Sequence, residues 1–388
     1  MRVAYVCADP GIPVFGNKGA SVHVQGVIRA MRARGARVEL LAARVGGPAP
    51  TGLEDVAVHL LPGRVSGSSI EREVAASRAG ADTTALDHLG PLDLVYERYS
   101  LWGRAAMAWA RRAGIPGVLE INAPLIDEHA RHRTLHDRAA AHAASREALG
   151  AASTIIAVSP PVADWVRTVV PDASCHVVPN GVDTDRVRPR ADPPGTAAAT
   201  CTVGFVGTLK PWHGIDTLVD VFGLLTRADP AYRLLVVGDG PEGPDLVRRL
   251  AVAGIADRAE LTGAVDPAAV PGLLARMDVA VAPYPATAGY FSPLKLYEYL
   301  AAGLPVVASR VGQVPDIVED GVTGILCPPG DAAAMATAVD RLRHDPVRAA
   351  ALGRAGRRAV VADHTWAAVV DRILAVADLP VPVPAVGV

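Results

Sequence analysis

The sequence predicts an α/β protein with two Rossmann-like, doubly wound parallel sheets. Buried apolar runs alternate with helical segments, which is typical of βαβ units. The apolar run at 2–8 is followed by a glycine-rich loop, a helix with apolar positions up to Met31, and a second strand at 36–42. A segment at 187–200 is rich in Pro, Ala, Arg and Asp and has no periodicity, and the alternation restarts at 201–207.

The interruption divides the chain into three expected regions. The first domain would cover 1–187 and the second 188–363, and a helix and tail at 364–388 would pack back on the first domain. The length of 388 residues favours two domains over one because a single core of that size is unusual.

Within this frame the same alternation places the other elements. Further strands are expected at 56–61, 93–99, 117–122, 153–159, 175–179, 233–238, 259–262, 279–283, 305–309 and 324–327. Further helices are expected at 71–89, 103–113, 125–149, 161–170, from 215, and at 245–253, 267–276, 293–302 and 365–377.

Composition excludes several classes of protein. The net charge of −2 gives no electrostatic basis for binding nucleic acid or an anionic membrane. A 50% hydrophobic and 20% charged composition describes a globular chain, and no apolar run reaches the length of a transmembrane helix. No signal peptide pattern opens the sequence, so a cytoplasmic location is expected. The four cysteines, Cys7, Cys175, Cys201 and Cys327, lie far apart without a CxxC pair, which favours buried thiols over a zinc site or disulfides.

The segment at 290–309 reads as a loop, a helix and a buried strand. Ser292 suits the N-cap, Pro293 the first helical position, and Gly303 a left-handed C-terminal cap. Lys295 would place a cation in the first turn, where the helix dipole is already positive, so an anion such as phosphate is expected beside it. Glu298 lies on the same helical face. The alternative is an ordinary capped helix with a Lys–Glu surface pair.

Lysine is rare in this chain. Of 38 basic residues only Lys18, Lys210 and Lys295 are lysines, and all three lie where a loop enters a helix. Lysine carries a compact charge that Arg does not replace. The three positions are therefore predicted phosphate sites.

Glycines at 11, 16 and 19 precede the first helix. Their spacing is not the GxGxxG of a dinucleotide-binding turn, although the physical use could be the same, namely close approach of backbone N–H groups to an anion. A plain turn is the alternative.

Polar residues follow two strands of the first half, at Glu97, Arg98, Glu120 and Asn122. Because open α/β sheets bind ligands at the carboxyl ends of strands, these are site candidates, with turn or surface roles as the alternative.

Six motifs in order give the chain a resemblance to a known family. They are the opening glycine loop, PNGVD (179–183), GFVG…HG (204–214), VGDGP (237–241), SPLKLYEYLAAGLPVVAS (292–309) and GQVPD…DGVTG (312–324). The chain resembles GT-B-fold glycosyltransferases over nearly its whole length, most closely the retaining family 4 group. The resemblance implies two domains facing each other across a cleft, with a nucleotide-diphosphate sugar bound mostly by the second.

The resemblance also implies roles for individual residues. Glu298 would bind the ribose, and N–H groups at 292–295 would hold the diphosphate. The implied catalytic residues are Lys210, Lys295, Glu298 and Asn122. The implied donor-binding residues are Gly16, Lys18, Gly19, Thr208, His213, Gly238, Tyr290, Phe291, Ser292, Pro293 and Leu294. Acceptor contacts are expected from Glu97, Arg98, Glu120 and Glu128.

The sequence departs from the family pattern at four positions. Thr208 and His213 stand where relatives have the Arg and Lys that stabilise the leaving diphosphate, so Lys210 and Lys295 are expected to supply that charge. Tyr290 replaces the first glutamate of the E-x7-E pattern, and Asn122 stands about where many relatives have a histidine. Recognition of the sugar is therefore expected to differ.

The implied reaction transfers a sugar from a nucleotide-diphosphate sugar to a hydroxyl or amine of a small-molecule, glycan or lipid-linked acceptor, with retention. Fixed cations and N–H donors would stabilise the leaving diphosphate. No DxD motif follows a strand, so no metal or other cofactor is expected. The base is open between uridine, guanosine and thymidine, with UDP-sugars favoured. The acceptor and the oligomeric state are not specified. A non-catalytic nucleotide-sugar-binding protein and a nucleotide-sugar 2-epimerase of the same fold are the alternatives.

Overall fold

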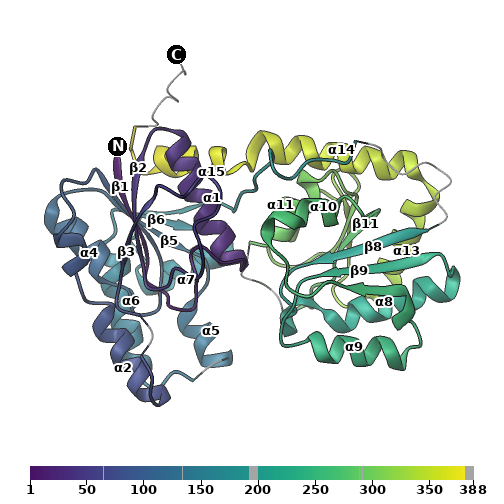
Figure 1. Ribbon diagram of the computed structural model, residues 1–388, viewed down its shortest axis with the longest axis horizontal. Coiled ribbons are helices and arrows are strands. Elements are labelled where there is room, and N and C mark those ends of the chain that lie inside the picture. Colours follow the sequence, from purple (N-terminus) through teal and green to yellow (C-terminus); the bar gives the residue numbers. More distant parts are fainter. Residues whose placement is uncertain (64, 133, 192–199, 288, 290–291, 381–388) are drawn as a thin grey trace. The chain divides into compact units, whose positions relative to one another are not determined.

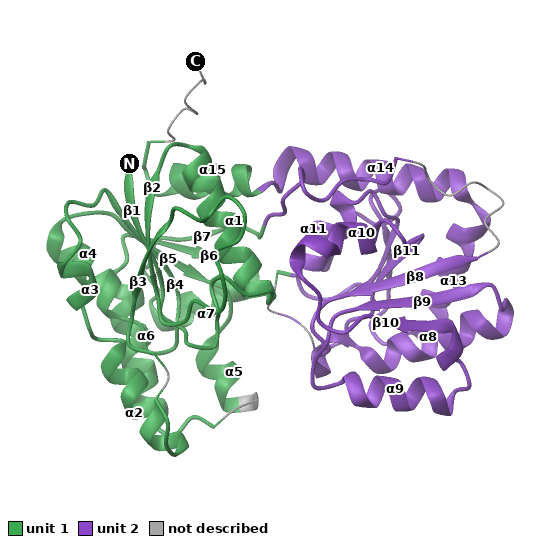
Figure 2. Ribbon diagram, viewed as in Figure 1, with its two compact units in different colours: residues 1–180, 290–292, 366–388 green, residues 181–289, 293–365 purple. Residues whose placement is uncertain are grey.

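The computed structural model describes residues 1–388 except 64, 133, 192–199, 288, 290–291 and 381–388. The chain divides into two compact units (Figure 2). Unit 1 comprises Met1–Asn180, Tyr290–Ser292 and Trp366–Val388, and unit 2 comprises Gly181–Gly289 and Pro293–Thr365. The first boundary therefore follows Asn180, within the PNGVD motif, rather than residue 187. Most of the predicted linker lies outside the described residues.

Unit 1 is built on a seven-stranded parallel sheet in the order β3-β2-β1-β4-β5-β6-β7 (Figure 1). Its strands are β1 (Arg2–Cys7), β2 (Arg37–Ala42), β3 (Ala57–Leu60), β4 (Leu94–Arg98), β5 (Gly117–Ile121), β6 (Thr154–Ala157) and β7 (Cys175–Val177). Its helices are α1 (Gly19–Ala33), α2 (Ser69–Ala79), α3 (Thr84–Asp87), α4 (Ala105–Ala113), α5 (Leu125–His132), α6 (Arg138–Ala151), α7 (Pro160–Val169) and α15 (Trp366–Val376).

Unit 2 repeats the plan with a six-stranded parallel sheet in the order β10-β9-β8-β11-β12-β13. Its strands are β8 (Cys201–Val206), β9 (Tyr232–Val237), β10 (Ala259–Leu261), β11 (Val279–Ala282), β12 (Val306–Ser309) and β13 (Ile325–Cys327). Its α-helices are α8 (Ile215–Ala228), α9 (Gly243–Val252), α10 (Val270–Leu274), α11 (Leu294–Ala301), α12 (Val314–Ile317), α13 (Ala332–His344) and α14 (Pro346–Asp363). Short 3-10 turns lie at Pro211–His213, Ala256–Arg258 and Pro267–Ala269.

Both sheets are doubly wound, as predicted. The strand order reverses between β1 and β4 in unit 1 and between β8 and β11 in unit 2. The connections on either side of such a switch point run to opposite faces of the sheet, which leaves a crevice at the carboxyl ends of the two strands. Each unit therefore has one place at which its fold favours a ligand.

The C-terminal helix α15 packs on α1 within unit 1. The Trp366 ring meets the His23 ring edge to face, with centroids 4.9 Å apart. A Cβ on Gly26 would lie only 2.4 Å from the Trp366 indole, so the contact requires a glycine there. The Arg34 guanidinium also pairs with the Asp371 carboxylate.

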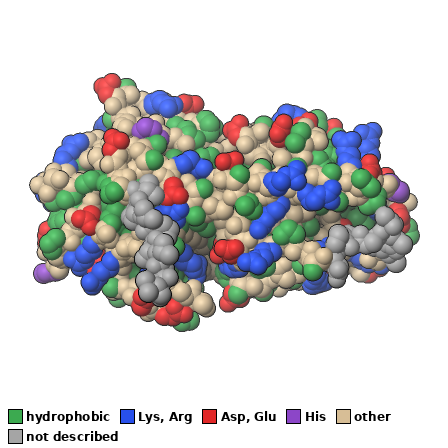
Figure 3. Space-filling view, turned by 90° about the horizontal axis from the view of Figure 1, so that it is seen from above, with side chains coloured by type: hydrophobic (Ala, Val, Ile, Leu, Met, Phe, Trp, Pro, Cys, Tyr) green, Lys and Arg blue, Asp and Glu red, His purple; other side chains and the backbone are tan. Residues whose placement is uncertain are grey.

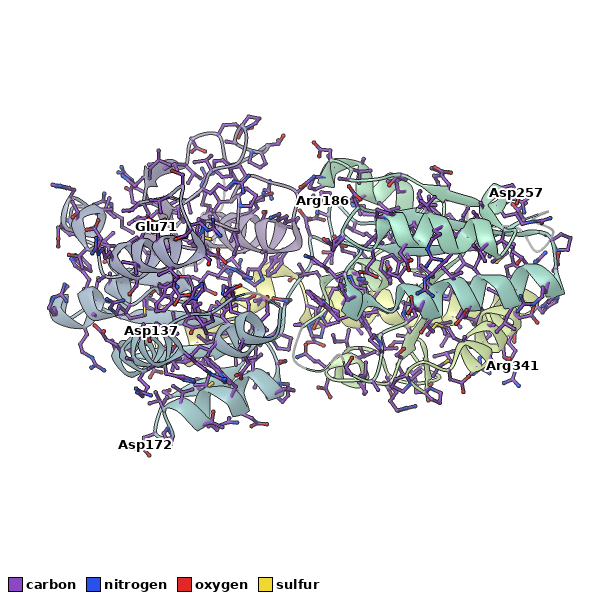
Figure 4. The ribbon with its side chains drawn as sticks, turned by 90° about the horizontal axis from the view of Figure 1, so that it is seen from below. Glu71, Asp137, Asp172, Arg186, Asp257 and Arg341 are labelled. Carbon is purple, nitrogen blue, oxygen red and sulfur yellow. The ribbon has the colours of Figure 1, made fainter. Side chains whose placement is uncertain are left out.

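Two long helices predicted in unit 1 are broken. The predicted helix at 71–89 is α2 and α3, because the chain turns at Gly80, where a Cβ would lie 1.9 Å from the carbonyl oxygen of Trp102. The helix predicted at 125–149 is α5 and α6, and Asp137 caps the second of these by accepting from the Ala140 N–H. Figure 4 labels Asp137 and also Glu71, which completes a capping box with Ser68 at the start of α2.

Two other differences concern unit 2. Helix α11 begins at Leu294 with Pro293 as its N-cap, so the assignment of Ser292 as N-cap and Pro293 as first helical residue is wrong by one position. Helices α13 and α14 had no predicted counterpart, since their Ala- and Arg-rich sequences carry weak apolar periodicity.

The surface agrees with a nearly neutral chain. On the face shown in Figure 3, acidic and basic side chains are interspersed. Among the described residues, no helix is both long enough and apolar enough to span a membrane.

Candidate functional site: a buried lysine in unit 2 and a pocket in unit 1

Helix α11 is fixed at both ends. At its C-terminus, Gly303 has a φ of 68°, and the Leu304 N–H donates to the carbonyl oxygen of Tyr299 at 3.1 Å. This is a Schellman cap, so the prediction of a left-handed Gly303 is confirmed. The hydroxyl of Tyr299 accepts from the Val206 N–H at 2.7 Å. The helix is thereby tied to the last residue of β8, and its first turn lies beside the β8/β11 crevice.

Lys295 is buried at the β8/β11 switch point. Its side chain is 7% exposed, and among the described residues its Nζ has no hydrogen-bond partner. The Nζ lies 4.0 Å from the centre of the Phe205 ring and 5.3 Å from that of Tyr284. Burial lowers its pKa to about 7, against the opposing effect of the Glu298 carboxylate. An ammonium held by ring faces alone retains the capacity to donate to an anion.

Glycines make room for this arrangement. Gly207 follows β8 with a φ of 137°, and a Cβ there would lie 3.0 Å from the Lys295 Nζ. Gly238 follows β9 with a φ of 134°, and its Cβ would lie 2.2 Å from the carbonyl oxygen of Gly207. Gly214 fits against Pro283 at the end of β11, where a Cβ would lie 1.7 Å from the carbonyl oxygen. The VGDGP and GFVG…HG motifs are thus packed together at the switch point.

Thr208 and His213 lie in the loop that follows β8. His213 is half-buried, and its Nδ1–H donates to the carbonyl oxygen of Thr208. Burial, followed by the charge of Lys295, lowers the pKa of His213 to about 2, so the ring is neutral. Lys210 is half-buried with its Nζ 5.6 Å from the Trp212 ring. The positive charge of this loop therefore comes from lysine rather than from His213.

Glu298 lies one turn after Lys295 and is half-buried. Burial raises its pKa to about 6, although the Arg186 guanidinium and the Lys295 ammonium oppose that rise. A carboxylate of this kind can accept hydrogen bonds from a diol. The structure brings Lys295 and Glu298 together as the sequence predicted.

Arg186 has no counterpart among the sequence-predicted site residues. The Asp183 carboxylate accepts from the backbone N–H groups of Asp185, at 3.1 Å, and Arg186, at 2.9 Å. This turn fixes the backbone of Arg186 (labelled in Figure 4), and the guanidinium Nε is buried without a hydrogen-bond partner among the described residues. The sequence signal was available, because the Asp of PNGVD is followed three residues later by a cation.

In unit 1, the side-chain amide of Asn180 donates to the carbonyl oxygen of Ser292 at 2.9 Å. The backbone N–H of Asn180 donates to the Ser292 hydroxyl. Two distant motifs are therefore in contact. Pro293 and Leu294 begin α11. Tyr290 and Phe291 lie outside the described residues.

The glycine loop before α1 is also in unit 1. The amide of Gln25 donates to the carbonyl oxygens of Val14, at 2.9 Å, and Gly16, at 3.0 Å, which holds the loop against the helix. Lys18 is the exposed N-cap residue of α1, and its Nζ donates to the carbonyl oxygen of Gly11. Gly19 is the exposed first residue of the helix.

Three of the strand-end candidates gather in one buried network. The Glu120 carboxylate is 2% exposed and accepts from the Nε2 of His23 at 2.9 Å, the Nη1 of Arg98 at 3.2 Å, the Tyr96 hydroxyl and the Asn122 amide. Burial alone would raise the pKa of Glu120, but His23, followed by Arg98 and the Tyr96 hydroxyl, lowers it to about 2. The charges of Glu120 and Arg98 therefore neutralise each other, and Asn122 is the member of the network placed beyond the strand end. Glu120 and Arg98 are 2% and 9% exposed and are paired with each other in this network.

Glu97 occupies a different environment. It is 1% exposed and its Oε2 has no hydrogen-bond partner among the described residues. Burial raises its pKa to about 8. It borders a small cavity of about 30 Å³.

A larger pocket of about 300 Å³ lies at the β1/β4 switch point of unit 1. Its walls come from residues 8–11 after β1, 61–63 after β3, 100–103 after β4, the helix α2 and the start of α5. Glu128 belongs to α5, whose Leu125 and His129 line the pocket, but Glu128 itself does not. Among the described residues no cluster of three His, Cys, Asp or Glu side chains is arranged to hold a metal ion.

Two family patterns match adjoining parts of the chain. Residues 17–186 match Glycosyltransferase Family 4, and residues 200–345 match Glycosyl transferases group 1. The chain belongs to this glycosyltransferase family.

Individual relatives are more distant. A GDP-mannose-dependent alpha-(1-6)-phosphatidylinositol monomannoside mannosyltransferase of Mycolicibacterium smegmatis is 34% identical over 50% of this chain and 54% of its own length. A 2-deoxystreptamine glucosyltransferase of Streptomyces kanamyceticus is 31% identical over 53% of this chain and 52% of its own. The chain thus spans about half the length of these relatives.

Solved structures resemble the whole chain. A sucrose-phosphate synthase from Thermosynechococcus elongatus has a TM-score of 0.74 at 22% identity and covers 96% of this chain and 97% of its own. The Anabaena protein Alr3699/HepE, in complex with UDP and glucose, has a TM-score of 0.72 at 20% identity, with coverage of 97% and 98%. These likenesses confirm the GT-B fold of this glycosyltransferase-family chain.

Proposed function

We propose that this protein transfers a sugar from a nucleotide-diphosphate sugar to an acceptor, with retention of anomeric configuration and without a metal. The observation that carries the proposal is the buried Nζ of Lys295, which has no hydrogen-bond partner among the described residues at the β8/β11 switch point of unit 2. Retention is taken from the family resemblance. The fold, the family match and the crevice all favour a phosphate-bearing ligand there.

A diphosphate fits the residues that surround the crevice. In the first turn of α11 the Leu296 N–H donates to the carbonyl oxygen of Pro293 at 3.1 Å, whereas helix geometry gives the N–H groups of Leu294 and Lys295 no intrahelical acceptor, and the helix dipole is positive at that end. Lys295 and Lys210 add two cations, and the positive-φ Gly207 keeps the space near the Lys295 Nζ free of a side chain. Glu298, one turn on, is the group we assign to the ribose hydroxyls.

The chemistry follows from where charge develops. Breaking the anomeric C–O bond leaves negative charge on the diphosphate and positive charge on the sugar. Lys295, Lys210 and the α11 N–H groups would stabilise the leaving group, and one donor of this kind is typically worth about 3 kcal/mol. We propose that a phosphate oxygen accepts the proton of the attacking acceptor group on the same face of the sugar.

The choice of base belongs to this proposal. We favour uridine, because the Anabaena protein of similar fold is described in complex with UDP, whereas the mycobacterial relative is described as GDP-mannose-dependent. Both bases therefore enter the test.

The test is turnover of a donor by the purified protein in the presence of EDTA. UDP-glucose, UDP-N-acetylglucosamine and GDP-mannose are incubated with the protein, first alone and then with an acceptor panel that includes myo-inositol, glucose and their amino analogues. We expect slow hydrolysis of one donor alone and faster release of its nucleotide diphosphate with one acceptor. Donor binding without hydrolysis or transfer in any combination would contradict the proposal and support a binding protein. A strict requirement for a divalent cation would contradict metal independence.

A further inference from the structure

The pocket of unit 1 lies at the same topological position as the lysine site of unit 2. The pocket lies at the carboxyl ends of β1 and β4, where the strand order of unit 1 reverses. Lys295 likewise lies beside the carboxyl ends of β8 and β11, where the strand order of unit 2 reverses. A volume of about 300 Å³ is at the lower end of ligand sites and suits a molecule of one or two rings. Leu61, Leu101 and Trp102 supply apolar walls.

A small annex adjoins this pocket. The cavity of about 30 Å³ shares Ala8, Leu61, Ala79, Gly80 and Gly103 with the larger pocket, so these residues border both. This volume has room for a small polar group such as a water molecule or an ammonium. Gly103 borders the annex, and a Cβ there would lie 2.5 Å from the Ser100 Oγ and 2.6 Å from the Glu97 Oε1.

The annex is lined mostly by apolar side chains, and both of the ionisable residues in its lining are acidic. Its lining includes the carboxyl groups of Glu97 and Asp82 and no basic side chain among the described residues. Asp82 is already engaged, since its Oδ1 accepts from the N–H and hydroxyl of Thr84. The Glu97 Oε2 is buried and has no partner within the described part of the chain.

The neighbouring cation, Arg98, does not pair with Glu97. Arg98 is the next residue on β4, and its guanidinium donates to Glu120, so strand alternation sends it to the other face of the sheet. A buried carboxyl oxygen without a hydrogen-bond partner is costly, and beside a pocket it offers a place at which a ligand group can supply that hydrogen bond.

We propose that the unit 1 pocket binds an acceptor with a small ring that carries a primary amine, and that its ammonium group enters the annex and pairs with Glu97. The ring lies against the apolar walls, and Glu97 selects for the amino group. This inference rests on the proposed transferase function and narrows its acceptor class.

The test compares matched amine and hydroxyl probes on the full chain saturated with UDP. Glucosamine is paired with glucose, and 1-amino-1-deoxy-scyllo-inositol with scyllo-inositol, and affinities are measured by calorimetry and saturation-transfer NMR. We expect at least one amine to bind ten-fold or more tightly than its hydroxyl partner. In Glu97→Gln, an isosteric change, that ratio should fall to within two-fold. Equal affinities in both wild-type pairs, or an unchanged ratio in the variant, would overturn the inference.

A second variant and two control measurements distinguish loss of amine selectivity from misfolding. Gly103→Ala fills the annex without altering a charge, and it should also abolish the preference for the amine, so misfolding of one variant does not leave the idea untested. Thermal melts and circular dichroism report the fold of each variant. Donor hydrolysis by the wild-type protein is recorded in parallel. If hydrolysis is present and the amine preference is absent, only this inference fails; if no donor is turned over, the proposed function fails.

Discussion

The Nζ of Lys295 lies 4.0 Å from the centre of the Phe205 ring, and no described residue accepts a hydrogen bond from it. Phe205 is the penultimate residue of β8, and Lys295 is in the first turn of α11, so the contact joins two of the motifs found in the sequence. A buried lysine without an anion destabilises the free protein. That cost is explained if an anion binds there during function.

Replacement of Lys295 should raise the stability of the protein and lower its activity. Lys295→Met removes the buried charge, so we expect the ligand-free protein to melt at a higher temperature at pH 6.5. Donor turnover should fall about 100-fold, the effect of losing about 3 kcal/mol of leaving-group stabilisation. Calorimetric melts and initial rates check the two effects.

A matched control is available in the same unit. Arg343 also lies over an aromatic ring, 4.6 Å from that of Tyr232, but it has a carboxylate partner in Asp229 at 2.9 Å. Arg343→Met should lower the melting temperature and leave UDP affinity unchanged. Wild-type turnover in Lys295→Met, or lost UDP binding in the control, would contradict the assignment.

Binding of UDP should depend on pH through Lys295. A bound diphosphate favours the ammonium form, and the pKa of Lys295 without ligand is about 7, so binding above pH 7 requires uptake of a proton. Affinity should therefore fall as pH rises from 7 to 9, by up to about ten-fold per pH unit, a range in which UDP itself is already fully charged. Calorimetry in buffers of different ionisation enthalpy measures the proton uptake.

The stability of the ligand-free protein should have the opposite pH dependence. The folded pKa of Lys295, about 7, lies below the ordinary value of 10.5, so the unfolded chain binds more protons between these pH values. The penalty is complete below pH 7 and is relieved as pH rises toward 10.5, so stability rises across that window. In Lys295→Met both slopes should be smaller. A pH-independent proton count in the wild type would refute this account.

The sequence predicted the parts of this site that depend on local pattern. Lys295, Glu298 and the left-handed Gly303 follow from capping rules and helical spacing within one segment. The features of the site that depend on tertiary contacts could not be predicted from local sequence patterns. The neutral state of His213 depends on burial beside Lys295, and the pairing of Glu120 with His23 joins residues 97 positions apart. The need for a glycine at position 80 similarly depends on the approach of the Trp102 carbonyl oxygen from a distant turn.

Gly207 should tolerate no side chain if the anion site is as described. Its φ of 137° is unfavourable for an L-residue, and a Cβ would lie 3.0 Å from the Lys295 Nζ. We expect Gly207→Ala to weaken UDP binding at least ten-fold. Gly254→Ala is the control for strain alone, because Gly254 has a φ of 68° and a Cβ there would have no atom within 4 Å. It should cost about 1 kcal/mol of stability without changing UDP affinity. Equal UDP affinity in both variants would count against the site.

Arg186 should control the ionisation of Glu298. The guanidinium favours the carboxylate form and so opposes the effect of burial, which raises the pKa of Glu298 to about 6. In Arg186→Leu that opposition is lost, and the pKa should rise further, toward neutrality. If the Glu298 carboxylate accepts hydrogen bonds from ribose hydroxyls, UDP affinity in this variant should be several-fold weaker at pH 6.5 and recover as pH rises to 7.5.

Arg188→Leu removes a neighbouring exposed arginine, whose ion pair is with Asp185, and should bind UDP as the wild type does. Titration of both variants with UDP at the two pH values, compared with ribose-free inorganic diphosphate, locates the effect. A loss of affinity that is equal for UDP and diphosphate would assign Arg186 to the phosphates rather than to Glu298.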